Sequence, residues 1–226
     1  EFRAFGSTAN CSNAMTTLNT IVAKQLKDFK IEVDALIDSK GLKKDEAIFN
    51  VLREYIKVSK NILFEGDGYS EAWEKEAAKR GLSNFKTTPE ALKARASKQA
   101  LDLFSEMGIL NHVEMEARYE IELEEYTKKV QIEGRVLGDL SINHVIPTAI
   151  RYQNTLIENV KGLKDIFGDE FKTLAKEQIS LIRDISGHIE GINSKVEAMT
   201  NERKKANNLT DAQAKAEAYC NKVKPY

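Results

Sequence analysis

The chain has 226 residues, of which 42% are hydrophobic and 31% are charged, so it is long enough for one large or two modest domains with a packed core. Its 34 basic and 35 acidic side chains leave a formal net charge of −1, which provides no broad basic surface for nucleic acid or an anionic membrane. Only three prolines occur in the whole chain, and this scarcity favours long uninterrupted helices.

The two cysteines, Cys11 and Cys220, are far apart in the sequence and form no metal-binding pattern. Such sparse use of cysteine is typical of a reducing compartment. No signal-peptide pattern opens the sequence, and no run of about 18 apolar residues could span a bilayer. We therefore expect a soluble protein of the cytoplasm, with neither a nucleic-acid nor a membrane partner.

The sequence opens with Glu1-Phe2-Arg3, which we interpret as a short β-strand followed by a turn at Gly6-Ser7. Side chains two residues apart lie on the same face of a strand, so Glu1 and Arg3 are expected to point the same way. A carboxylate suits a hard divalent cation, and a guanidinium suits a phosphate or a carboxylate. This pair is the strongest chemical signal in the sequence. Because it stands at the first residues of a chain without an initiator Met, we expect the chain to be the rear part of a larger protein.

The first half of the remaining sequence predicts four helices. Apolar residues at three- and four-residue steps predict a helix over residues 15–37, ended by Gly41 in a left-handed conformation. A second helix is expected over residues 43–63. Ser70 is a good N-cap for a third helix that ends near Gly81. A fourth helix is expected over residues 88–104, with Pro89 at its favoured first position.

The second half predicts long helices with apolar seams. A charged helix is expected from Asn111 to about Gly138, followed by a helix over residues 138–162 that bends at Pro147. The seam of the charged helix has nearly heptad spacing: Tyr119, Leu123, Tyr126, Val130, Gly134 and Leu137. The last long helix alternates steps of three and four: Ile182, Ile185, Ile189, Ile192, Val196 and Met199. A short Ala-rich helix capped by Thr210-Asp211 follows. The predicted fold class is mainly α, with a short N-terminal β-strand followed by long helices that form hairpins or a bundle.

Other candidate sites have simpler explanations. The carboxylates between Glu114 and Glu125 surround a long helix and are typical of a solvated face. The three histidines match neither zinc nor di-iron spacing, although His144 stands beside the expected bend. Gly66-Asp67-Gly68 lacks the strand and the Gly-Lys-Ser/Thr of a phosphate loop, so it is a turn. Periodicity alone therefore indicates a helical interaction module without an identifiable activity.

Short motifs add a resemblance to a known family. Glu1-Phe2-Arg3 followed by Thr8-Ala9-Asn10 resembles the last catalytic strand of glutamine synthetases. Further motifs are similar to the type III branch, the large glutamine synthetases typical of Bacteroidetes. They are Gly68-Tyr69-Ser70 with Trp73, Thr88-Pro89-Glu90-Ala91-Leu92, Glu116-Ala117-Arg118-Tyr119-Glu120, Tyr126-Thr127-Lys128-Lys129, Pro147-Thr148-Ala149-Ile150 with Tyr152-Gln153-Asn154, and Ser194-Lys195-Val196-Glu197-Ala198-Met199. The similarity covers nearly the whole chain.

The resemblance implies a role for each residue of the opening pair. Glu1 is expected to bind a divalent cation, Mg²⁺ or Mn²⁺, on the nucleotide-phosphate side of the site. Arg3 is expected to contact the phosphoryl group or the activated γ-carboxylate. The family uses ATP to form γ-glutamyl phosphate from glutamate, and ammonia then attacks it to give glutamine. The family also assembles as homo-oligomers of stacked hexameric rings.

The resemblance also predicts what this chain lacks. The other cation ligands, the nucleotide pocket, the ammonium site and the N-terminal β-grasp half belong before Glu1, so the chain by itself is expected to be inactive. Residues 1–130 are expected to be the C-terminal part of the catalytic domain, and residues 131–226 a type III-specific helical extension. Two alternatives stay open. One is a non-enzymatic helical scaffold that oligomerises through its seams, and the other is a regulatory platform formed by the helices from Gly138 onward.

Overall fold

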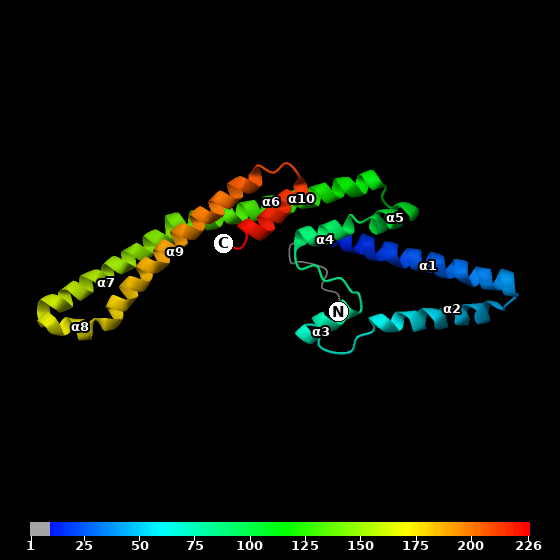
Figure 1. The fold of residues 1–226 in the computed structure, drawn as a ribbon, viewed down its shortest axis with the longest axis horizontal. Helices are drawn as coiled ribbons and strands as arrows, with labels where there is room; N and C mark the ends of the chain where they lie inside the picture. Colours follow the sequence, from blue (N-terminus) through cyan, green and yellow to red (C-terminus); the bar gives the residue numbers. More distant parts are fainter. Residues whose placement is uncertain (1–9) are drawn as a thin grey trace. The chain divides into compact units, whose positions relative to one another are not determined.

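The computed structural model describes residues 10–226, and this part of the chain is built from helices joined by turns and loops (Figure 1). No β-strand occurs among residues 10–226. The prediction of a mainly α fold is therefore confirmed, while the strand expected at Glu1-Phe2-Arg3 lies outside the described residues. None of the helices in the described range is long and apolar enough to cross a membrane.

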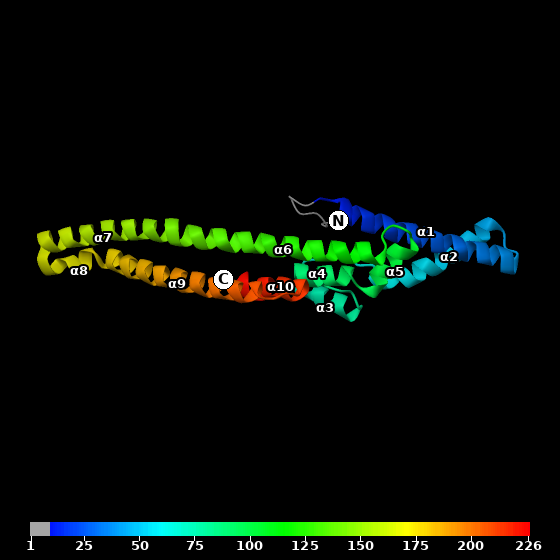
Figure 2. The same cartoon turned by 90° about the horizontal axis from the view of Figure 1, so that it is seen from above.

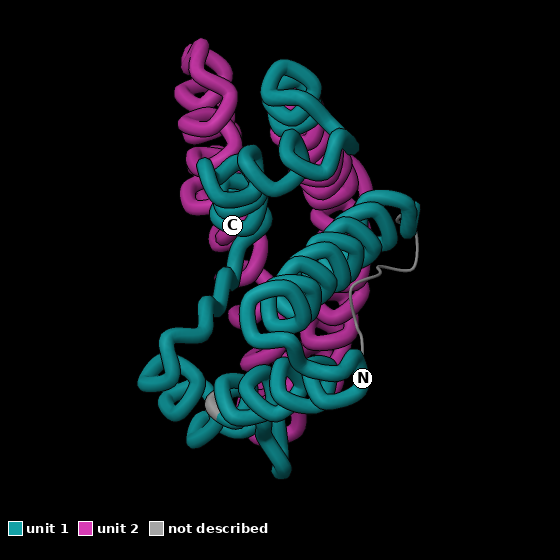
Figure 3. The backbone as a smooth tube through the Cα atoms, turned by 90° about the vertical axis from the view of Figure 1, so that its right-hand side faces the viewer, with its two compact units in different colours: residues 1–119 teal, residues 120–226 magenta. Residues whose placement is uncertain are grey.

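The chain divides into two compact units, residues 1–119 and residues 120–226 (Figure 3). The helices that lie wholly in the first unit are α1 (Ser12–Lys40), α2 (Lys44–Ser59), η1 (Lys60–Ile62), α3 (Glu71–Lys79), α4 (Thr88–Arg95) and α5 (Lys98–Glu106). The division falls within α6 (His112–Leu140). After α6, the second unit contains η2 (Ser141–Val145), α7 (Ile146–Phe167), η3 (Gly168–Glu170), α8 (Phe171–Leu174), α9 (Lys176–Asn207), α10 (Ala212–Ala218) and η4 (Tyr219–Val223).

A helical hairpin of α1 and α2 dominates the first unit (Figure 1). Its core contains Val33 from α1 and Ala47 and Val51 from α2, all buried. The predicted left-handed end of α1 is confirmed, since Gly41 has φ 64° and its N–H bonds to the Ile37 carbonyl at 2.9 Å. The α-helix α2 ends at Ser59, and the chain continues as the 3-10 turn η1 to Ile62, close to the predicted end at residue 63.

The prediction of one continuous helix over residues 88–104 is wrong, because α4 ends at Arg95 and α5 begins at Lys98. Ser97 causes the break: its hydroxyl accepts a hydrogen bond from the Ala100 N–H at 3.4 Å and so starts a new helix. By contrast, the predicted cap at Ser70 is confirmed, because its hydroxyl accepts from the Trp73 N–H at 3.2 Å.

In the second unit, α7 and α9 run antiparallel along their length (Figure 2). The predicted seam of α9 is confirmed, because its five β-branched residues are half-buried and Met199 is buried. Polar side chains tie the two helices together as well. The Gln153 amide donates to the Ile182 carbonyl at 2.8 Å and to the Ser186 hydroxyl at 2.7 Å.

The helix boundary near Pro147 takes a different form from the predicted bend. Instead, α6 continues into the π-helical turn η2, and Pro147 sits in the first turn of α7. The Ile146 N–H reaches back to the Ser141 carbonyl, five residues earlier. Proline has no N–H and crowds the preceding turn, so a wider turn directly before it accommodates the ring without ending the helix.

The core of the second unit lies between α6, α9 and η4. Val130, Met199, Ala206, Tyr219 and Val223 form one buried cluster. The α6 seam is confirmed at Leu123 and Val130, which are buried, but its last predicted member, Leu137, is 51% exposed. Gly138 lies on the seam instead of Leu137. A step of four residues from Gly134 rotates about 40° past a full turn, whereas a step of three stops about 60° short of one. A Cβ at Gly138 would lie 3.5 Å from Met199 and from Val196.

Two glycines of the second unit should respond oppositely to replacement by alanine. Gly168 has φ 53° and ψ −128° after α7, a conformation that disfavours alanine, whereas Gly187 lies inside α9. An added Cβ meets nothing within 4 Å at either position, so backbone preference alone decides the outcome. We expect Gly168→Ala to lower the free energy of unfolding by about 1–3 kcal/mol, and Gly187→Ala to raise it by about 0.8–1 kcal/mol. Chemical denaturation followed by circular dichroism measures both, and a shift of the same sign in the two variants would contradict this account.

Candidate functional site

The residues that the sequence singled out for chemistry, Glu1 and Arg3, lie outside the described residues. Within residues 10–226, no three His, Cys, Asp or Glu side chains come together in an arrangement that could hold a metal ion. The described residues therefore offer no donor set for the divalent cation that the resemblance implies, and Glu1 is the one carboxylate that the sequence assigns to it. His112, His144 and His188 lie on three different elements, α6, η2 and α9.

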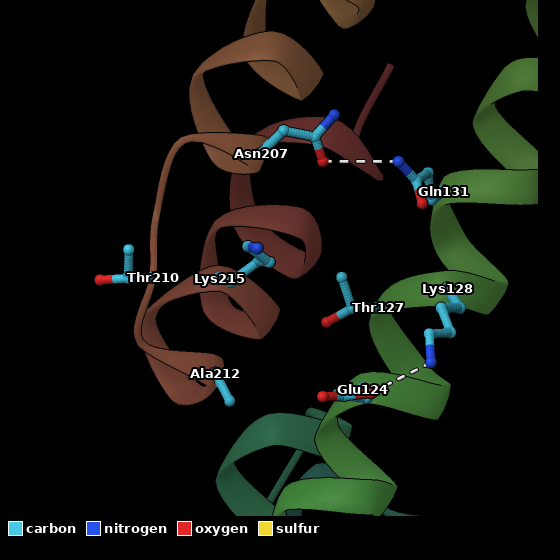
Figure 4. A pocket seen from close by; sticks show the side chains of 8 residues that line it. All are labelled: Glu124, Thr127, Lys128, Gln131, Asn207, Thr210, Ala212 and Lys215. Carbon is cyan, nitrogen blue, oxygen red and sulfur yellow. Dashed lines mark hydrogen bonds and ion pairs between the residues drawn. The ribbon is translucent and has the colours of Figure 1, made fainter.

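The structure shows a polar cavity in the second unit that the sequence did not predict (Figure 4). Its volume is about 300 Å³, and it lies between α6 on one side and the end of α9 with α10 on the other. Eight residues line it: Glu124, Thr127, Lys128, Gln131, Asn207, Thr210, Ala212 and Lys215. The four from α6 have the spacing i, i+3, i+4 and i+7, which is a polar helix face beside the apolar seam. That spacing is the one sequence signal that could have indicated a wall of the cavity.

Hydrogen bonds fix one end of this cavity. The Asn207 side-chain oxygen accepts a hydrogen bond from the Tyr219 hydroxyl at 2.6 Å and a longer one from the Gln131 amide at 3.4 Å. Tyr219 is fully buried, and this burial raises the pKa of its hydroxyl above the usual value of 10. The hydroxyl therefore remains a neutral donor, and it holds the Asn207 oxygen in one orientation.

The charged groups of the cavity are not equally paired. The Lys128 ammonium lies 3.0 Å from the Glu124 carboxylate one helical turn earlier, and these two side chains are 67% and 62% exposed. Such an exposed pair contributes little stability and opens readily. Lys215 on α10 is half-buried and makes no hydrogen bond or ion pair with any residue of the described chain.

A second buried polar group lies close to the core. The Tyr126 hydroxyl is buried and has no hydrogen-bond partner among residues 10–226. Burial, and then the neighbouring Cys220 thiol, raises the pKa of Tyr126 well above its usual value. Tyr126 therefore stays a neutral phenol at physiological pH. The sequence pattern predicted that Tyr126 lies on the apolar seam of its helix. This is correct for the ring, but the pattern gives no information about the hydroxyl.

Comparison with known proteins identifies the family. Residues 47–164 match the family model of the glutamine synthetase C-terminal domain. The chain is 48% identical over 227 residues to a glutamine synthetase of Bacteroides fragilis (strain YCH46), which covers 100% of this chain and 31% of that protein. It is 37% identical over 163 residues to a type-3 glutamine synthetase of Dictyostelium discoideum, covering 72% of this chain and 22% of that protein.

A glutamine synthetase of Butyrivibrio fibrisolvens is 28% identical over 174 residues, which are 77% of this chain and 24% of that protein. The chain thus spans less than a third of the length of each of these relatives. The resemblance inferred from the motifs is confirmed, since the family model covers more than half of the chain and reaches into both of its units. The chain belongs to the glutamine synthetase C-terminal domain family.

Proposed function

We propose that this chain is the helical C-terminal part of a type III glutamine synthetase and takes part in the ATP-dependent ligation of ammonia to glutamate. The observation that carries the proposal is the 48% identity to a glutamine synthetase over the full length of the chain. Because the chain corresponds to 31% of that relative, the activity belongs to a longer polypeptide that supplies the rest of the site.

The opening residues give this chain its chemical share in the proposed reaction. The Glu1 carboxylate provides one oxygen ligand to Mg²⁺ or Mn²⁺. The Arg3 guanidinium donates hydrogen bonds to the transferred phosphoryl group or to the γ-carboxylate of glutamate. When bound, ATP and the cation supply the phosphoryl group and neutralise its charge. Placing a fixed positive group beside this charge lowers the barrier to phosphoryl transfer.

An exposed apolar face of α1 supports the proposal that the chain is part of a larger protein. Five apolar side chains at helical spacing are 40–63% exposed: Met15, Leu18, Ile21, Val22 and Leu26. An apolar stripe of this kind is typical of a surface that another part of a protein covers. We propose that the preceding part of the polypeptide packs on it, that residues 1–130 complete a catalytic domain, and that residues 131–226 form a type III extension. The intact protein would be cytoplasmic and would form stacked hexameric rings.

A chimera tests the proposal. The segment of the Bacteroides fragilis enzyme that aligns with this chain is replaced by the chain itself, and phosphate release from ATP is measured with and without glutamate and ammonia. We expect release that depends on both substrates, and none from the isolated chain. A chimera that assembles into rings of the parent size but stays inactive would contradict the proposal and favour a helical scaffold.

A further inference from the structure

We propose that the polar cavity between α6 and α10 is a binding site for a small molecule that carries a carboxylate and a single net negative charge. Its volume of about 300 Å³ is at the lower end of the range of small-molecule sites, so only a small metabolite fits. The site is independent of Glu1 and Arg3 and adds a ligand to the protein whether or not the ligase assignment holds.

One lysine of the cavity lining has no counter-charge within residues 10–226. Lys215 is half-buried on the cavity wall and has no partner in the described chain. A half-buried lysine that has no counter-ion can pair with an anion that enters the cavity, through a charge-assisted hydrogen bond. Lys128 stands on the opposite wall, and its exposed pairing with Glu124 leaves it able to turn toward a ligand.

One hydroxyl of the cavity lining makes no hydrogen bond within the described part of the chain. Thr127 is 8% exposed and lines the wall opposite Lys215 (Figure 4). Three helical threonines, Thr17, Thr20 and Thr155, donate their hydroxyls to the carbonyl four residues earlier. The Thr127 hydroxyl makes no such bond within residues 10–226. The hydroxyl is not sealed off from the cavity, so it is available to a ligand oxygen.

The charged side chains of the lining favour a ligand with one negative charge. Lys128 and Lys215 against Glu124 leave the lining with one net positive charge. This balance matches a monoanion, whereas the Glu124 carboxylate repels a group with two negative charges. A carboxylate, which carries one negative charge, therefore fits better than the dianionic form of phosphate. Hydrogen bonds from Tyr219 and Gln131 hold the Asn207 side chain, so this part of the cavity wall is in place before a ligand binds.

The test uses the whole chain with ¹³C-labelled alanine and threonine methyl groups. Sodium lactate and, separately, inorganic phosphate are titrated at about pH 8, where phosphate is mostly a dianion, at constant ionic strength against sodium chloride, and the Ala212 and Thr127 methyl signals are followed. We expect saturable shifts with lactate, weaker shifts with phosphate, and none with chloride. Lys215→Met is expected to weaken lactate binding by about tenfold, and Thr127→Val is expected to weaken it as well.

The matched control is Lys195→Met, since Lys195 is exposed on α9 and does not line the cavity. This variant should bind lactate as the unaltered chain does. Lactate shifts no larger than those of chloride, or unchanged binding in both Lys215→Met and Thr127→Val, would overturn the site. Tighter binding of phosphate than of lactate would overturn the carboxylate assignment.

Discussion

Replacing Arg3 by alanine in the chimera is expected to lower ligase turnover by a factor on the order of 10³. A positive group that faces a transferring phosphoryl group stabilises charge that develops in the transition state, so its loss reduces the turnover number more than it weakens substrate binding. Phosphate release at saturating ATP, glutamate and ammonia measures the effect. Arg3→Lys should recover part of the rate, because it restores the charge without the two-pronged geometry of a guanidinium.

The control for this experiment is Arg183→Ala, because Arg183 is exposed on α9. It should leave the turnover number within about twofold of the unaltered chimera, an effect below 0.5 kcal/mol. Turnover of the Arg3→Ala chimera at the rate of the control would remove the role assigned to Arg3. Retained turnover would not affect the family membership, which rests on the sequence match.

Replacing Tyr219 by alanine is expected to lower the free energy of unfolding of the second unit by about 3–5 kcal/mol. The ring is fully buried among Val130, Met199 and Val223, so its removal leaves a cavity in the core. Tyr219→Phe keeps the ring and removes only the bond to Asn207, which still accepts from Gln131, and should therefore cost about 0.5–1.5 kcal/mol.

Native-state hydrogen exchange resolves this effect by region, because the slowest amides of α6 and α9 report the global opening of the unit. Tyr152→Ala is the control, since that side chain is 53% exposed on α7 and its loss should change the free energy by no more than about 0.5 kcal/mol. Equal costs for Tyr219→Ala and Tyr219→Phe would mean that the bond to Asn207, rather than the buried ring, stabilises the unit.

The helices could be predicted from the sequence where one hydrophobic periodicity extends over the whole helix. The seam from Ile182 to Met199 was correct throughout, because steps of three and four leave only one face to bury. The break at Ser97 was missed because apolar residues recur every four positions across it, at Leu92, Ala96, Ala100 and Phe104. The two π turns, η2 and η4, were missed because bonds to the fifth preceding carbonyl have no sequence signature of their own.

The cavity could not be predicted from local spacing. Gln131 and Asn207 are 76 residues apart in sequence and meet only because α9 and α10 return along α6. The unpaired state of Lys215 is also a tertiary property, since any lysine in an Ala-rich helix reads as a solvated residue. The candidate chemistry at Glu1 and Arg3 came from the motif alone, and it stays a prediction because the described residues begin at Asn10.

The π turn η2 has a consequence for rotational phase. Gly138 on α6 and Gln153 on α7 both face α9, and Ile146 between them is buried. In an uninterrupted α-helix, the eight residues from Gly138 to Ile146 would rotate the chain about 80° beyond two full turns. Each residue of a π turn advances less than 100°, so the five residues of η2 cancel most of that excess. The length of this segment therefore matters for the structure apart from the identity of its residues. One residue fewer would turn the whole of α7 away from α9.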